Sequence, residues 1–249
     1  LPAFMSKRMN LPEQAKETAV TEWENIKATN TELPDMKGWQ CTCGIDYMKV
    51  TDFASVNLHF KKGEERFDIN HSWICSHSKD LPRIKAPWQQ WVKEGRITYI
   101  DDVEIHPSII TDYIFEMGKQ YNIKMMLLDN FRFALLSDAL AKIGFRTEAG
   151  NLRLISQMDI LRIVPVIDHC FANQYFCWGD NPVLRWSVNN TKLVPYGKKA
   201  GIDRGSFVYA KIEAKSRKND PFMALVASMI GEGEIKEYVP LTDKTPLVL

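Results

Sequence analysis

The sequence lacks an excess of either charge, because 32 Lys and Arg residues offset 31 Asp and Glu residues to leave a formal net charge of +1. A balance this even exerts no general attraction toward nucleic acids or membranes, so any nucleic-acid surface must come from local clusters of Lys and Arg. The sequence also lacks an apolar run approaching ~18 residues, the length that a membrane-spanning helix needs. We therefore expect no membrane partner.

Cysteine is scarce. The five cysteines are an odd number, and no secretory signal leads the chain. This combination favours a reducing compartment. Cys41, Cys43 and Cys75 could bind zinc together with His71 and His77, but Cys-x-Cys is not the usual spacing, and strands would scatter these side chains over two faces. We therefore disfavour a zinc site.

Internal repeats are absent, and so is the Gly-x4-Gly-Lys-Ser/Thr loop that cradles the phosphates of ATP. A chain of 249 residues suits one large domain, or one domain with appendages, and a hydrophobic content of 45% is ordinary for a packed protein. We expect a leader at residues 1–37, a folded domain at residues 38–231 and a polar tail at residues 232–249.

The hydrophobic pattern predicts three consecutive strands at residues 39–49, 54–60 and 66–75, with a hairpin turn between the second and the third. Helices are predicted over residues 13–29, 86–94, 107–121, 131–143, 156–173, 181–188 and 220–230, and further strands over residues 97–100, 123–128, 192–196 and 207–214. This order predicts an α/β fold with a mixed central sheet, in which three antiparallel strands precede parallel strands and helices flank the sheet.

Three aspartates suggest a metal site. Asp46 lies in the first predicted strand, where a carboxylate is costly unless its charge is compensated. Asp129 ends a buried apolar run, and Asp220 opens a late helix. If the strand that carries Asp46 and the strand that ends at Asp129 are adjacent and parallel, their carboxylates meet near the strand ends, where open α/β sheets bind ligands. Such oxygen donors suit Mg²⁺ or Mn²⁺, and two ions ~3.5–4 Å apart, bridged by Asp46, would support phosphodiester hydrolysis.

Each aspartate also has a structural interpretation. Asp220 alone is more often a helix N-cap, with Pro221 at the first helical position. Asp129 alone is more often a loop residue or a cap of the following helix. Asp46 would otherwise need a buried Lys or Arg partner. The spacing of the three residues does not decide between these interpretations.

The segments around the three aspartates resemble the nuclease motifs of the large terminase subunits of tailed bacteriophages. The first motif is similar to Gly44-Ile45-Asp46-Tyr47 continued by Thr51-Asp52-Phe53-Ala54-Ser55, the second to Leu127-Leu128-Asp129-Asn130, and the third to Arg217-Lys218-Asn219-Asp220-Pro221-Phe222-Met223-Ala224-Leu225. Residues 181–186 with Asn189-Asn190, and residues 4–12, also resemble family segments, so the resemblance extends from about residue 4 to residue 231.

The resemblance implies an RNase H-like fold and an endonuclease that cuts concatemeric double-stranded DNA with two Mg²⁺ or Mn²⁺ ions. It implies Asp46, Asp129 and Asp220 as ligands, and a supporting role beside them for Asp52. The absent ATP-binding loop fits a nuclease domain apart from its ATPase motor, to which the leader would connect. The small terminase subunit and the portal protein are the further partners implied, in the host bacterial cytoplasm. The alternatives are a non-catalytic DNA- or portal-docking module, and another RNase H-like nuclease of the resolvase or integrase type.

Basic residues near the motifs are candidates for binding DNA phosphates without sequence preference. Lys61 and Lys62 lie in the predicted hairpin, and Lys215, Arg217 and Lys218 precede Asp220. Further candidates are Lys198, Lys199 and Lys211. Any single lysine also fits a solvated surface, but the last two residues before Asn219 are the stronger candidates because the chain carries them to the third motif.

Overall fold

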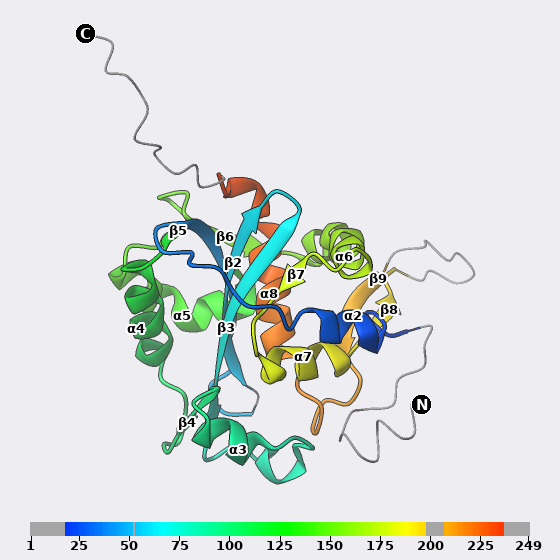
Figure 1. The fold of residues 1–249 in the computed structure, drawn as a ribbon. Helices are drawn as coiled ribbons and strands as arrows, with labels where there is room; N and C mark the ends of the chain where they lie inside the picture. Colours follow the sequence, from blue (N-terminus) through cyan, green and yellow to red (C-terminus); the bar gives the residue numbers. More distant parts are fainter. Residues whose placement is uncertain (1–17, 52, 198–206, 237–249) are drawn as a thin grey trace.

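The structure is a computed structural model, and residues 18–51, 53–197 and 207–236 of it are described. Within these ranges the main sheet has the strand order β4-β3-β2-β1-β5-β6, with β7 paired to β3 (Figure 1). Its strands are β1 (Gln40–Asp46), β2 (Ala54–Lys62), β3 (Glu65–Cys75), β4 (Ile97–Ile100), β5 (Asn122–Asp129), β6 (Leu152–Ile155) and β7 (Phe176–Cys177). A second sheet pairs β8 (Thr191–Pro195) with β9 (Phe207–Lys211).

The helices are α2 (Trp23–Ala28), α3 (Trp88–Lys93), α4 (Pro107–Gly118), α5 (Asn130–Lys142), α6 (Gln157–Ala172), α7 (Pro182–Asn189) and α8 (Asp220–Ile230), with the short 3₁₀ turns η1 (Leu81–Arg83) and η2 (Glu232–Glu234). Strands β1, β2 and β3 form an antiparallel meander, whereas β5 and β6 continue the sheet parallel to β1. The predicted mixed α/β architecture is confirmed.

The two faces of the sheet are covered by different helices (Figure 1). Cys41, Cys43 and Ile45 of β1 belong to a buried apolar cluster that includes Ile114 of α4 and Leu136 of α5. The other side chains of β1 face α8, which also packs against β2 and α6. Because side chains alternate along a strand, β1 is buried on both faces, as expected for a central strand.

Some boundaries differ from the prediction. The first strand ends at Asp46 instead of continuing to residue 49, so the carboxylate lies at the strand end and not in its middle. The described part of the expected helix at 13–29 is helical only over α2, because Ala19 forms a β-bridge with Lys192. Strand β6 was missed, since its four residues carry too little pattern to be recognised.

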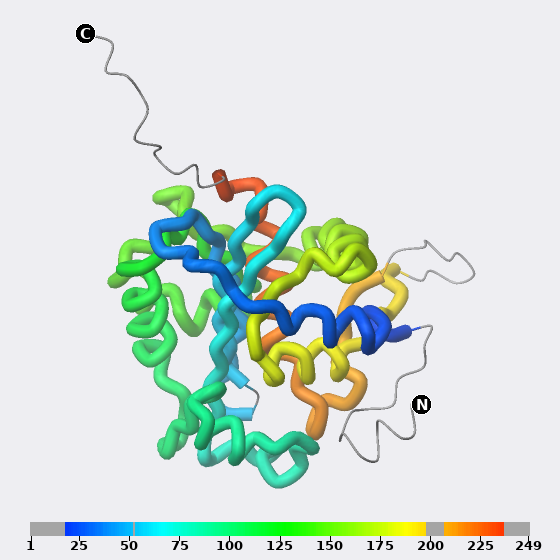
Figure 2. Tube along the Cα trace, viewed as in Figure 1, coloured from blue at the N-terminus to red at the C-terminus, as the bar shows by residue number. Residues whose placement is uncertain are grey.

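The described part of the predicted leader packs on the domain. Figure 2 traces it from α2 across the sheet to β1. Ile26 belongs to a buried cluster with residues of α6 and α8, and Thr29 accepts a backbone hydrogen bond from Trp178 at 2.9 Å. At the other boundary, Glu232 of the predicted tail bonds to His59 and Arg66. The packed structure therefore extends beyond residues 38–231 on both sides. No helix in the described ranges is long and apolar enough to cross a membrane.

Candidate metal centre

The parallel pairing of β1 with β5 brings two of the predicted aspartates to one edge of the sheet. Gly44 of β1 lies opposite Leu127 of β5, and the strands end two residues later at Asp46 and Asp129. Since both strands run in the same direction, both carboxylates emerge at their carboxyl ends, which is where α/β sheets place ligands. The predicted adjacency of these strands is confirmed.

Helix α8 brings the third aspartate to Asp46 by lying directly against β1. The hydroxyl of Thr42 donates to the carbonyl oxygen of Ser228 at 2.8 Å. Two residues along β1, a side-chain carbon at Gly44 would overlap the carbonyl oxygen of Ala224. Each step of two residues on the strand matches one helical turn on α8, so a further step places Asp46 beside Asp220. Only glycine at position 44 permits this approach.

The local structure at Asp220 differs from the expected cap. Asn219 is the N-cap of α8, Asp220 is the first helical residue and Pro221 follows it. The Asp220 carboxylate is fully buried, and its Oδ1 accepts from Nζ of Lys211 at 3.1 Å. A capping role therefore does not account for this residue. Asp129, by contrast, does cap α5 through the backbone N–H of Arg132, as its structural interpretation anticipated.

Arg132 joins the aspartates and was not identified from the sequence. Its Nε donates to Oδ1 of Asp46 at 2.5 Å, and a second guanidinium nitrogen donates to Oδ2 of Asp129. Burial lowers the pKa of Arg132, but the charges of Asp46, Asp129 and Asp220 outweigh burial and raise it. The structure thus provides Asp46 with the arginine partner that its structural interpretation required. The available signal was the spacing of three residues between Asp129 and Arg132 at a helix start.

The electrostatics of Asp46 reflect its crowded position. Burial and the charge of Asp220 raise the pKa of Asp46 to about 7, although Arg132 and Lys211 both act to lower it. The side chain is only 9% exposed. Two buried carboxylates side by side repel each other, and this repulsion is relieved by a cation or a proton. The cluster therefore has a strong tendency to bind positive charge.

The donor chemistry fits a hard divalent cation, because all three predicted ligands offer carboxylate oxygens. Within residues 18–51, 53–197 and 207–236, however, no three His, Cys, Asp or Glu side chains are arranged as a ready metal-binding group. The Arg132 guanidinium lies between the carboxylates of Asp46 and Asp129. The three carboxylates are suitable ligands for a divalent ion, but in this structure the positive charge between Asp46 and Asp129 is the guanidinium of Arg132.

The predicted DNA-contacting residues fall into two groups. Lys215 is exposed and Arg217 is half-buried, and both lie in the loop that leads into α8. Lys218 in the same loop is buried, and its Nζ pairs with Asp80 at 2.6 Å, so its predicted contact with DNA is not supported. Lys198, Lys199 and the predicted supporting residue Asp52 lie outside the described residues.

The hairpin lysines lie at the wrong end of the sheet for the acidic cluster. Ser55 of β2 pairs with Asp46, whereas Lys61 is six residues further along β2, a separation of about 20 Å. Lys61 pairs with Glu232 at 3.0 Å, and Nζ of Lys62 lies over the Trp39 ring, 5.8 Å from its centroid. A phosphate bound at the acidic cluster cannot contact these two lysines.

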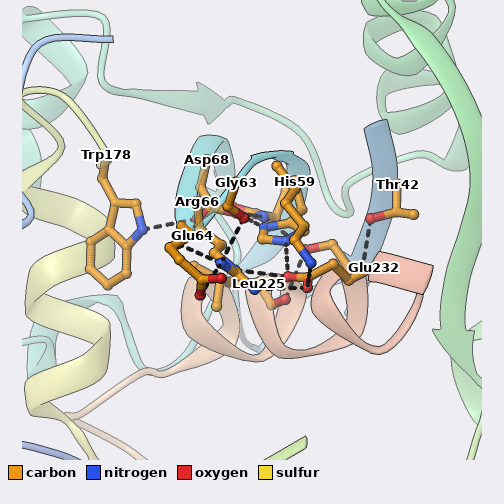
Figure 3. A network of polar contacts seen from close by, with 12 residues as sticks. Thr42, His59, Gly63, Glu64, Arg66, Asp68, Trp178, Leu225 and Glu232 are labelled. Carbon is orange, nitrogen blue, oxygen red and sulfur yellow. Dashed lines mark hydrogen bonds and ion pairs between the residues drawn. The ribbon is translucent and has the colours of Figure 1, made fainter. Parts of the chain in front are cut away.

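A second buried polar network lies at the other end of α8 (Figure 3). His59 of β2 contacts Asp68 through Nδ1 at 2.9 Å and Glu232 through Nε2 at 3.1 Å. Asp68 also accepts from the indole nitrogen of Trp178 at 3.0 Å, and Glu232 accepts from two nitrogens of Arg66 at 3.0 and 2.9 Å. These bonds fix the chain after α8 to strands β2 and β3.

Charge in this network is balanced by pairing. Burial acts to lower the pKa of His59, but the carboxylates of Asp68 and Glu232 raise it to about 9. Burial acts to raise the pKa of Glu232, but His59, Arg66 and Lys61 hold it well below its usual range. The imidazolium of His59 and the carboxylate of Glu232 are therefore both charged near neutral pH.

The order of the strands and the position of the acidic cluster define an RNase H-like fold. The HK97 bacteriophage large terminase shares this fold with a TM-score of 0.70 at 17% sequence identity, over 93% of this chain and 48% of that chain. The large terminase nuclease from thermophilic phage G20c shares it with a TM-score of 0.53 at 8% identity, over 85% of this chain and 97% of that chain. This chain therefore spans about half the length of the HK97 protein.

The family model described as terminase large subunit, endonuclease domain, matches residues 1–229. The chain belongs to this family, as the three motifs predicted. No curated protein matches the chain significantly.

Proposed function

We propose that this chain is the endonuclease of a DNA-packaging terminase and hydrolyses phosphodiester bonds of concatemeric double-stranded DNA with little sequence specificity. The observation that carries the proposal is the convergence of Asp46, Asp129 and Asp220, from β1, β5 and α8, at the carboxyl edge of the central strands. The three carboxylates are close enough together that the charge of each one raises the pKa of Arg132. Family membership supports the same reaction.

Asp46 is the ligand proposed to bridge two Mg²⁺ or Mn²⁺ ions, because it lies between the other two carboxylates. Asp129 would hold one ion and Asp220 the other. Such ions, when bound, supply a nucleophilic water and stabilise the departing oxygen. The protein contributes the rigid placement of the three carboxylates: a strand end, a helix cap and the buried first turn of a helix.

The wider assembly is also a proposal. Family membership favours an ATPase domain of the same large subunit, the small terminase subunit and the portal protein as partners, and the cytoplasm of the bacterial host as the compartment. The loop with Lys215 and Arg217 leads directly into Asp220 and is the surface proposed to bind the DNA backbone.

Plasmid cleavage with Mg²⁺, Mn²⁺ or EDTA tests the reaction. We expect cleavage with either ion, none with EDTA, and at least a ~100-fold loss of rate in Asp46→Asn, because groups that merely support metal ligands already contribute 10- to 100-fold. Asp138→Asn, on the exposed surface of α5, is the matched control and should cleave normally.

Cleavage that persists in EDTA, or full activity of Asp46→Asn, would contradict the metal-dependent mechanism. A wild-type chain that binds DNA in a gel-shift assay but cuts with neither ion would favour the non-catalytic docking module.

A further inference from the structure

The guanidinium of Arg132 lies between the carboxylates of Asp46 and Asp129, in the space where an ion held by both would lie. It contacts Oδ1 of Asp46 at 2.5 Å and also bonds to Oδ2 of Asp129. Divalent ions lie ~2.0–2.6 Å from their oxygen ligands, which is within the space that these nitrogens take. One pair of oxygens cannot hold a guanidinium and a divalent ion at once, so the two cations must exclude each other.

Arg132 can leave without disturbing the carboxylates. Its side chain is 22% exposed, so it has access to solvent. Its backbone N–H donates to Oδ1 of Asp129 at 2.8 Å, and this cap remains when the side chain rotates away. Asp46 is fixed by the sheet and by the contact of β1 with α8. Only a flexible side chain has to move.

We propose that Arg132 is a displaceable counter-ion, which competes with a divalent ion for Asp46 and Asp129 and transfers to a DNA phosphate when the ion binds. The inference rests on the proposed function, because it assumes that these carboxylates hold the ion. Phosphate is a natural second partner, since the planar guanidinium pairs with phosphate as it does with carboxylate. When a DNA phosphate pairs with the guanidinium, the carboxylate oxygens of Asp46 and Asp129 become available to the ion. DNA and the divalent ion should therefore each strengthen binding of the other.

Binding of Mn²⁺ without DNA, measured from the electron paramagnetic resonance signal of the unbound ion, tests the competition. Removing the competitor in Arg132→Gln should tighten Mn²⁺ binding by about 5- to 150-fold, the usual range of coupling between sites. The matched control is Arg153→Gln, whose arginine pairs with Asp159 at 2.5 Å on the surface, and it should bind Mn²⁺ as wild type does. Unchanged or weaker binding by folded Arg132→Gln would overturn the proposal.

A measurement on the wild-type protein decides the matter even if Arg132→Gln fails to fold. The Nε–H resonance of Arg132 can be assigned by its absence from the spectrum of Arg132→Lys. Titration with Mg²⁺ should move it toward the position of a solvent-exposed arginine. If Mg²⁺ binds and the resonance does not move, the counter-ion role is wrong and the nuclease assignment stands. If neither Mg²⁺ nor Mn²⁺ binds to any form of the protein, both proposals fall.

Discussion

Two buried side chains, Asp46 and His59, both hold protons more tightly than usual, but for opposite reasons. For Asp46 the causes are burial first and the charge of Asp220 second, so the raised pKa reflects the cost of a buried negative charge beside another one. For His59 burial acts the other way, and attraction to Asp68 and Glu232 raises the pKa. The first residue is under electrostatic stress that a cation relieves, whereas the second stabilises the fold.

The stabilising role of His59 predicts a pH dependence. The pKa rises from 6.5 to about 9 on folding, so the contribution is complete below pH 6.5 and is lost as the pH rises through about 9. The free energy of unfolding, measured with urea, should fall by up to about 3 kcal/mol over this window because of His59. In Glu232→Gln the imidazolium has one carboxylate fewer and the folded pKa is raised less, so the decline should be smaller and should end at lower pH. An identical pH profile in both proteins would contradict this account.

At the scale of the element, α8 connects the two polar clusters. Asp220 opens the helix at the acidic edge, and Glu232, just beyond its end, is held in the network with His59. The apolar spacing and Pro221 were enough to predict the helix. The change of N-cap to Asn219 and the contact with Gly44 could not be predicted, because both depend on packing between segments far apart in the sequence.

Replacing Gly44 by alanine should separate α8 from β1. The added carbon would overlap backbone atoms of Ala224 and Ser228, so the helix must shift. Overpacking of this kind costs about 1–3 kcal/mol or more in the free energy of unfolding, measured by urea denaturation. Metal-dependent cleavage should fall as well, because Asp220 moves with the helix. Gly118→Ala is the control, since nothing lies within 4 Å of a carbon added there, and it should be as stable as wild type.

At the scale of the whole molecule, the architecture was predictable and the surface was not. The consecutive strand patterns at 39–49, 54–60 and 66–75 were sufficient to predict the meander. The buried apolar run before Asp129 was sufficient to predict the parallel strand. The sequence could not predict which lysines face DNA, because the direction and the pairing of a side chain depend on the tertiary structure. Lys218 turned out to be buried against Asp80, and the hairpin lysines lie far from the acidic edge. Arg132 was missed because an arginine in a first helical turn is unremarkable in sequence.

This geometry predicts which basic residues control DNA affinity at the acidic edge. Each phosphate contact contributes about 0.9 to the slope of log affinity against log salt concentration. The double variant Lys215→Ala/Arg217→Ala should therefore reduce the magnitude of the slope by roughly 2, measured by fluorescence anisotropy with a DNA duplex. Lys62→Ala should leave the slope unchanged. A larger effect of Lys62→Ala than of the double variant would show that DNA lies along the hairpin instead.

The contact at Gly44 also has a genetic consequence. The atoms that a larger side chain would meet first are the carbonyl oxygen of Ala224 and the backbone nitrogen of Ser228, and every amino acid has both of these backbone atoms. No exchange of side chain at position 224 or 228 can remove these atoms. In a selection for restored DNA packaging, a Gly44→Ala mutant should therefore yield true revertants to glycine, and compensating changes within α8 should be rare.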